Sequence, residues 1–342
     1  MFHSRAAVLF KQKKKLKIID IKNIKNLKYG QVQVRLVTSG ICGAQINEIN
    51  GIKGEDKYIP HLMGHEGYGI VERVGPGVKK VKINNQVVLH WRKSSGINAE
   101  SAKFESKFGI INSGNVTTFS ERTIVSENRL TKFKPRNKNE ELLAPLLGCA
   151  IPTALFLIKK ESSILSTNKN SSILINGIGG LGLTIAICLK VLGYKNISFL
   201  EKFNYKKKFI SKLNVTFYNL FSKKLKNKKF SYVIDTTGNI DVISNSFNLL
   251  YKKSELILVG QPKIGNKLTI KNPLSFFDGK KIFASDGGGY EPAEDFIKMV
   301  KIVRKNLNLF KILISDIIPL DKINIGINKI KKGKSMRIII KL

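Results

Sequence analysis

Three side chains in the sequence could together hold a metal ion: Cys42, His65 and Cys149. Two thiolates and one imidazole form a ligand set found at catalytic zinc, because they leave a fourth position open for water or substrate. Glu66 follows His65 directly and could support the site or act as a transient ligand. The ligands are scattered along the chain, and a lone cysteine is often only a small buried apolar residue. The set is therefore a candidate catalytic zinc site, which spacing alone does not establish.

A second stretch has the pattern of a phosphate-binding loop. Residues 173–175 are apolar and β-branched in character, as in a buried parallel strand, and a G-x-G-x-x-G pattern follows them. The glycines would allow a tight turn, a close approach to a pyrophosphate and close helix–strand packing. The phosphates would sit at the helix N-terminus, where free N–H groups favour an anion. The loop residues expected to bind a cofactor are Gly177, Gly179, Gly180, Leu181 and Gly182.

The sequence after this loop predicts the rest of a dinucleotide fold. A second apolar run ends in Glu201, about 20 residues beyond the glycines, where a carboxylate is needed for the ribose hydroxyls. Strand-like runs follow at 232–235 and 256–260. We therefore expect a doubly wound parallel sheet of the Rossmann type. Since a carboxylate would repel a 2′-phosphate, NAD is expected rather than NADP, although Lys202 and Lys206 soften this argument.

Length and composition limit the class of protein. A chain of 342 residues with 42% hydrophobic residues can form two globular domains, and we see no signal peptide or membrane span. Three cysteines make no disulfide framework, so we expect a reduced, cytoplasmic protein. The net charge is +36, but the lysines are spread along the whole chain without interleaved aromatic residues. We therefore expect no nucleic-acid partner, while the positive field should attract anionic ligands.

The chain resembles the medium-chain, zinc-dependent alcohol dehydrogenase family over nearly its whole length. The similarity lies in GICG at 40–43, GHEGYGIV at 64–71, LGC at 147–149, GIGGLG at 177–182, DGKKIF at 278–283, IPLDKINIG at 318–326 and GKSMR at 333–337. The resemblance implies an α/β protein with a GroES-like β-rich catalytic domain and a Rossmann domain. It implies catalytic zinc on Cys42, His65 and Cys149, with Glu66 beside it. It also implies that Arg337 approaches the cofactor pyrophosphate.

The resemblance also sets the expected domain limits and partners. Residues 1–150 would form the first segment of the catalytic domain, 151–287 the Rossmann domain, and 288–342 a return segment that completes the catalytic domain. The expected substrate is a small alcohol or carbonyl compound, with an anionic one as an option. A homo-oligomer, either a dimer or a tetramer, is also expected. The polar stretch 94–116 is expected to be a loop excursion.

The sequence departs from the family pattern in several places. No four-cysteine cluster lies between His90 and Ser126, so we expect one catalytic zinc and no structural zinc. Ala44 lacks the hydroxyl that relays a proton in many members, and Gln45 replaces an aspartate that orients the zinc-bound histidine. Asn47 stands where a relay histidine is often found. The proton would then leave through water, or through a group such as His61 or His90.

Three alternative functions remain open at this point. A zinc-free reductase of enones or quinones is disfavoured by the intact set of two cysteines and one histidine. An enzyme acting on a phosphorylated or nucleotide-activated sugar or polyol is suggested by Trp91, Arg92 and Lys93 near the region where family members bind substrate. The third alternative is a basic nucleic-acid-binding protein on an inactive dehydrogenase fold.

Overall fold

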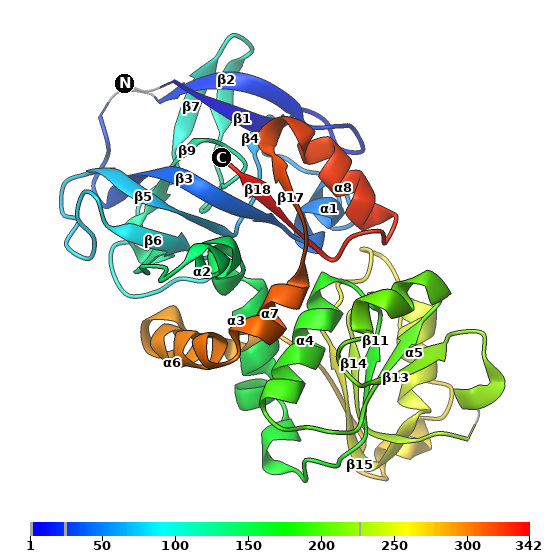
Figure 1. The fold of residues 1–342 in the computed structure, drawn as a ribbon. Helices are drawn as coiled ribbons and strands as arrows, with labels where there is room; N and C mark the ends of the chain where they lie inside the picture. The colour runs from blue at the N-terminus through cyan, green and yellow to red at the C-terminus, as the bar shows by residue number, and fades with distance from the viewer. Residues whose placement is uncertain (1–2, 24–25, 226) are drawn as a thin grey trace. The chain divides into compact units, whose positions relative to one another are not determined.

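The structure is a computed structural model that describes residues 3–23, 26–225 and 227–342. It consists of two compact units (Figure 1). The first unit comprises 1–150 together with 291–342, and the second comprises 151–290. The sequence predicted that the middle segment ends at residue 287, whereas the second unit of the structure ends at residue 290. In the part of the chain described, no single helix is long and apolar enough to cross a membrane. One bent pair of helices, 138–148 with 150–161, is long and apolar enough by length and composition only.

A small closed barrel forms one part of the first unit. Its strands, in spatial order, are β1 (His3–Leu9), β2 (Lys17–Asn23), β7 (Lys103–Ser106), β8 (Gly109–Asn112) and β4 (His61–Leu62). Strands β7 and β8 correct our expectation of a loop over 94–116. Each is only 4 residues long, so the alternation that marks a strand is too brief to see. The side chains of Phe104 in β7 and Ile111 in β8 are completely buried in the barrel core and anchor the two strands there.

A larger sheet brings the two ends of the chain together in the first unit. Its order is β10 (Leu130–Lys132), β6 (Gln86–Leu89), β5 (Gly67–Val74), β3 (Gln31–Ile41), β18 (Arg337–Lys341) and β17 (Ile314–Pro319), and β9 (Arg122–Ser126) also pairs with β3. The last strand, β18, lies antiparallel to β3, with Ile338 opposite Ile41. This register sets the residues just before β18 beside those just after β3. The return segment therefore completes the sheet around Cys42.

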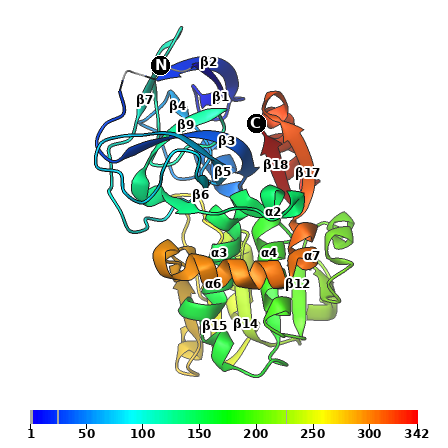
Figure 2. The same ribbon diagram turned by 60° about the vertical axis from the view of Figure 1, so that its left-hand side comes forward.

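Five α-helices accompany these strands: α1 (Gly43–Ile49), α2 (Lys138–Leu143), α6 (Pro292–Lys305), α7 (Leu307–Phe310) and α8 (Ile323–Lys331). Helix α6 begins with a proline, carries acidic residues in its first turn and ends with basic ones, as the helix dipole favours. Its buried residues Phe296, Met299, Val300 and Val303 recur at helical spacing and form one apolar face. Figure 2 shows α6 as the long orange helix of the return segment.

The second unit is built on a parallel sheet with six strands. Their order is β13 (Thr216–Asn219), β12 (Ile197–Glu201), β11 (Ile173–Asn176), β14 (Phe230–Asp235), β15 (Leu250–Leu258) and β16 (Lys281–Ala284). Every neighbouring pair is parallel. The strand order reverses at β11, which creates the switch point where such sheets bind ligands at their carboxyl ends. The expected Rossmann fold is confirmed, and β13 and β16 are strands that our sequence analysis did not identify.

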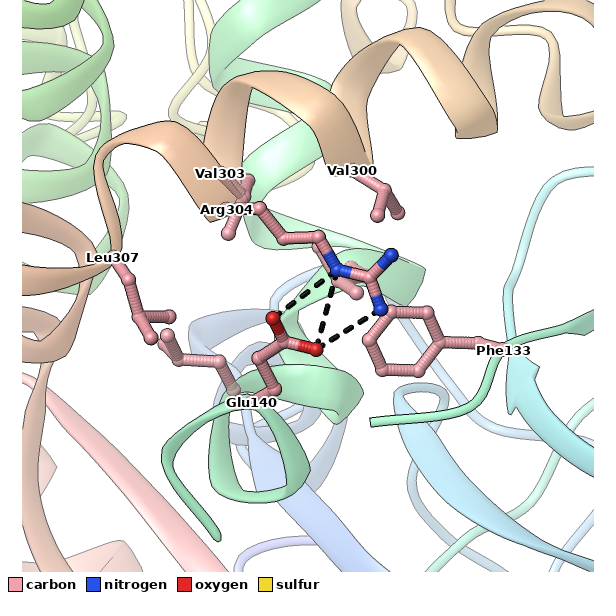
Figure 3. Close-up of a pocket in the computed structure, with 8 residues that line it drawn as sticks. Phe133, Glu140, Val300, Val303, Arg304 and Leu307 are labelled. Carbon is pink, nitrogen blue, oxygen red and sulfur yellow. Dashed lines mark hydrogen bonds and ion pairs between the residues drawn. The ribbon is translucent and has the colours of Figure 1, made fainter. Parts of the chain in front are cut away.

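An ion pair joins the return segment to the first segment inside the first unit (Figure 3). Arg304 of α6 donates from Nε and Nη2 to the carboxylate of Glu140, at distances of 3.0 to 3.2 Å. The guanidinium also lies over the Phe133 ring, 5.4 Å from its centroid. Glu140 is nearly buried, and apolar side chains such as Val300 and Leu307 line the same pocket. Because water has little access, this pair should stabilise the unit more than an exposed pair would.

We expect Glu140→Gln to lower the free energy of unfolding of the first unit by about 1–3 kcal/mol, because it leaves a partly buried guanidinium without its counter-charge. Urea unfolding followed by Trp91 fluorescence measures this, since Trp91 is the only tryptophan and belongs to the first unit. Glu100→Gln is the matched control, because the Glu100–Lys28 pair is exposed and its loss should hardly move the midpoint. Equal midpoints for the two variants would contradict this role of Glu140.

Candidate functional site

The structure brings the four predicted metal-site residues together in the first unit. Ligand atoms of Cys42, His65, Glu66 and Cys149 all lie within 4.8 Å of one another. Cys42 follows β3 and caps the N-terminus of α1, while His65 and Glu66 lie between β4 and β5. Cys149 follows a short 3-10 turn at Ala144–Gly148. Three separate parts of the chain therefore supply the group, which explains why sequence spacing gave so little guidance.

Close backbone contacts hold the His65–Glu66 segment against strand β3. The Glu66 carbonyl accepts hydrogen bonds from the Gly40 N–H at 3.1 Å and from the Ser39 hydroxyl at 3.0 Å. Gly64 has φ of +94°, and a Cβ there would lie 2.4 Å from the Thr118 hydroxyl oxygen. A larger residue at position 64 would thus be strained and would push His65 away from Cys42.

The Cys42 and Cys149 side chains interact directly in this arrangement. The Cys149 thiol donates to Cys42, which holds the pKa of Cys42 well below its usual range even though burial opposes this. The same contact and burial raise the pKa of Cys149. Burial works to lower the pKa of His65, but the neighbouring Cys42 thiolate and Glu66 leave it raised. A thiolate is therefore already favoured at Cys42, and a thiolate is the form that binds a metal.

A buried ion pair lies directly behind these ligands. Arg337 Nη1 donates to Glu66 Oε1 at 2.9 Å, and both side chains are almost completely buried. Burial raises the pKa of Glu66 to about 7, although the Arg337 charge opposes the rise. Our sequence analysis expected Arg337 at the cofactor pyrophosphate. In the structure the Arg337 guanidinium pairs with Glu66, and a role toward the cofactor remains a prediction.

The Gln45 side chain contacts two candidate metal ligands, the ring of His65 and the backbone of Cys42. Its side-chain oxygen accepts from the Cys42 N–H at 3.0 Å, and its amide nitrogen lies against His65 Nδ1 in a short hydrogen bond. Gln45 is buried and contacts the imidazole through its amide nitrogen, and its role in orienting His65 remains a prediction. Unlike an aspartate, it makes this contact without charge.

The two histidines considered for proton release are both engaged elsewhere. His90 donates from Nδ1 to the Arg92 carbonyl at 2.7 Å and meets the Thr131 hydroxyl with Nε2 at 2.9 Å. Burial lowers the pKa of His90 to about 4, so it stays neutral. His61 donates from Nδ1 to the Leu62 carbonyl, and its Nε2 lies 2.7 Å from Asp56. These contacts give both histidines structural roles.

The residues present fit a zinc ion. His65 Nε2 and Glu66 Oε2 are buried and have no hydrogen-bond partner among the described residues. Buried polar atoms are almost always satisfied, so an unpaired imidazole nitrogen beside two thiols indicates that a ligand belongs there. Two sulfurs and one imidazole are the soft and borderline donors that zinc prefers. Cys42, His65 and Cys149 would hold the ion, with Glu66 within reach.

The glycine loop of the second unit has room for a phosphate. A Cβ on Gly182 would lie 2.2 Å from the Gly177 carbonyl oxygen, so only glycine allows the helix to approach the strand this closely. A Cβ on Gly179 would meet nothing within 4 Å, which leaves open space at the point where the backbone must receive a ligand. Helix α4 (Gly180–Val191) begins there, with no side chain capping its first N–H groups.

The Glu201 carboxylate accepts four hydrogen bonds at the end of β12. Oε2 accepts from the Ile178 N–H of the glycine loop and from Lys206 Nζ, at 3.0 and 2.8 Å. Oε1 accepts from the backbone of Lys202 and Phe203. A carboxylate has about four lone-pair sites, so a ribose hydroxyl can bind only by replacing one donor. Lys206 is the only side chain among these donors and is the one able to move.

A metal centre of this composition in one unit and a dinucleotide loop in the other define a class of metal-dependent, nucleotide-linked oxidoreductases. Comparison with known proteins makes this more specific. The alcohol dehydrogenase GroES-like domain matches residues 28–135. Class-3 alcohol dehydrogenase of Drosophila melanogaster is 26% identical, over 98% of this chain and 97% of that protein.

Solved structures agree on the fold. Benzyl alcohol dehydrogenase from Acinetobacter calcoaceticus has a TM-score of 0.86 at 19% identity and covers 100% of both chains. An alcohol dehydrogenase zinc-binding domain protein from Burkholderia ambifaria has a TM-score of 0.87 at 20% identity, over 100% of this chain and 99% of that one. These similarities confirm our prediction that the chain resembles the medium-chain, zinc-dependent alcohol dehydrogenase family. The alternative functions are not favoured by these comparisons.

We expect the purified protein to bind about one zinc per chain, because a single group among the described residues combines two thiols with an imidazole, and the sequence has no four-cysteine cluster. Cys149→Ala should lose most of this zinc on dialysis, since it removes a thiolate ligand. Cys188→Ala is the control, because Cys188 is buried within α4 and belongs to neither group of potential metal ligands among the described residues. Elemental analysis decides the matter, and two zincs in the wild type or equal zinc in both variants would refute the assignment.

Proposed function

We propose that the protein transfers hydride between a nicotinamide cofactor and an alcohol or carbonyl substrate, with one catalytic zinc and no structural zinc. The observation that carries this proposal is the buried, unpaired His65 Nε2 beside Cys42 and Cys149, in a chain that also has a dinucleotide loop. As a family member the chain is an NAD(P)-dependent, alcohol dehydrogenase-like enzyme. The particular roles of its residues are our inference.

The side chains of the first unit bind and position the reacting groups. When bound, zinc supplies a Lewis acid that polarises the substrate oxygen. Cys42, His65 and Cys149 fix the ion, and Gln45 fixes the orientation of the imidazole. The Glu66–Arg337 pair balances charge behind the ligands, where two thiolates would otherwise repel a nearby carboxylate. Position 44 is alanine, so we propose that the alcohol proton leaves through water.

The residues of the second unit bind the cofactor. Gly179 and the free N–H groups of α4 receive the pyrophosphate, and Glu201 receives the ribose hydroxyls once Lys206 moves aside. We propose NAD as the favoured cofactor, because the Glu201 carboxylate repels a 2′-phosphate. The Lys206 ammonium lies 2.8 Å from that carboxylate and offsets part of its charge, so the preference should be modest.

The edge of the second unit suggests how copies of the chain associate. Strand β16 is an edge strand of the six-stranded sheet, and Leu274 and Phe277 just before it are 73% and 91% exposed. An unpaired strand edge beside exposed apolar side chains favours pairing with a second copy. We therefore propose a homo-oligomer, which sedimentation equilibrium would test. A cytoplasmic location is proposed on the ground that zinc-binding thiols need reducing conditions.

A screen of alcohols and aldehydes with NAD or NADH, followed by cofactor absorbance, tests the proposed reaction. We expect turnover of at least one pair by the wild-type enzyme. Cys149→Ala should lose nearly all turnover, while its binding of NAD to the separate glycine loop persists. Cys188→Ala should remain active. Full activity in Cys149→Ala would exclude the zinc mechanism.

Two substitutions should move the cofactor preference in opposite directions. Glu201→Gln removes the negative charge and should shift the ratio of kcat/KM for NAD over NADP toward NADP by about 10-fold, the scale of one charge interaction in a partly buried site. Lys206→Met removes the compensating ammonium and should shift the ratio toward NAD. Steady-state kinetics with both cofactors measures these ratios. Shifts in the same direction would show that Glu201 and Lys206 do not distinguish the 2′-hydroxyl of NAD from the 2′-phosphate of NADP.

A further inference from the structure

One arginine of the first unit is buried and has no acidic partner among the residues that the structure describes. Arg129 ends the short 3-10 helix Glu127–Arg129 and is only 5% exposed. Its Nη1 donates to the Trp91 carbonyl, whereas its Nε is buried without any partner among the described residues. Burial lowers the pKa of Arg129, and no nearby carboxylate raises it. A buried guanidinium without a counter-charge is costly unless an anion binds to it.

The one carboxylate on the same helix is already used by the backbone. Glu127 Oε1 accepts from the N–H groups of Lys79 and Lys80, at 2.6 and 2.5 Å. Its Oε2 accepts from the Ile97 N–H at 2.9 Å. The Glu127 carboxylate therefore binds the backbone of two loops, at 79–80 and at 97, and does not neutralise Arg129.

Other cations surround the same loop. Lys80 Nζ donates to the Ser94 hydroxyl at 2.8 Å and to the Ser95 carbonyl at 3.0 Å. The Arg92 guanidinium lies over the half-buried Trp91 ring, 5.3 Å from its centroid. The segment 91–95 thus combines an aromatic ring with several positive charges.

This loop begins beside the candidate metal centre. The His90 N–H donates to the Arg129 carbonyl at 3.1 Å, which ties the start of the loop to the buried arginine. A Cβ on Gly148 would lie 2.2 Å from the Leu89 carbonyl oxygen, so the residue before Cys149 packs directly on the residue before His90. Arg129, whose Nε has no partner among the described residues, and the candidate ligand Cys149 are therefore held by neighbouring stretches of backbone within one unit.

We propose that the segment 91–95 and Arg129 form a subsite for an anionic group, a carboxylate or a phosphate ester, on the substrate of this enzyme. Arginine recognises both groups through paired, charge-assisted hydrogen bonds, and the Trp91 ring offers an apolar wall for the carbon skeleton next to the charge. The inference rests on the proposed function, since it names the class of alcohol or carbonyl compound that the metal centre receives.

Trp91 gives a direct measure of binding, because it is the only tryptophan. Its fluorescence is titrated with benzoate, phenyl phosphate and neutral benzyl alcohol on the zinc-loaded full chain. We expect at least one anion to bind saturably, with a dissociation constant that rises with salt. Arg129→Gln should weaken that binding by about 10-fold or more, the effect of a lost charge-assisted hydrogen bond, and Arg129→Lys should restore part of it.

The controls separate a specific subsite from general attraction by a basic protein. Arg136→Gln removes the same charge from an exposed position of the same unit and should leave anion binding unchanged. Arg92→Gln provides a second variant at the subsite if Arg129→Gln unfolds, as shown by its urea midpoint. If both anions fail to bind, or bind equally well to the wild type and both subsite variants, the inference is wrong.

Turnover distinguishes this inference from the proposed function. The ratio of kcat/KM for 4-(hydroxymethyl)benzoate over benzyl alcohol should fall about 10-fold or more in Arg129→Gln, a change that a general loss of packing would not produce. If alcohols are oxidised but this ratio does not change, the function stands and the subsite is refuted. If anion binding depends on Arg129 but no alcohol or aldehyde reacts, the proposed function fails and the subsite stands.

Discussion

The ion pair between Arg337 and Glu66 is the interaction on which the candidate metal centre depends. Both groups are almost completely buried, and each would be costly there without the other. Glu66 is joined to the ligand His65, and Arg337 begins the last strand of the chain. The pairing of that strand with β3, which ends beside Cys42, places a positive charge behind two thiols. The C-terminal strand thus contributes to the electrostatics of ligands that lie far from it in the sequence.

The balance of charges in the first unit explains how the proposed anion subsite and the candidate zinc site can lie close together. The metal ligands bring thiolates and a carboxylate, and Arg337 offsets part of their charge. The neighbouring segment 91–95 has the opposite composition, with Arg129 and Lys80 near it and Glu127 occupied by backbone N–H groups. A substrate with an oxygen at one end and an anionic group at the other would match both parts.

The sequence predicted the parts of the structure that are encoded locally. The glycine loop and the strands around it have strong motif or periodic signals, and family similarity assembled the metal ligands. Contacts between distant residues could not be read in this way. The Glu66–Arg337 pair joins residues 271 positions apart, and the Glu140–Arg304 pair joins residues 164 apart. The hairpin of β7 and β8 was missed because strands of 4 residues show too little alternation, although Phe104 and Ile111 anchor it.

The division of the first unit into two chain segments has a consequence during biosynthesis. Cys42, His65 and Cys149 leave the ribosome before the middle unit, whereas Arg337 emerges only after it. At roughly 5–20 residues per second, the interval between residues 149 and 337 lasts roughly 10–40 s. Throughout this time the nascent chain exposes reactive thiols whose supporting strand has not yet been made. The charge balance behind the candidate ligands is therefore complete only once the strand that carries Arg337 has been made, and until then protection of the thiols falls to the reducing agents and chaperones of the cell.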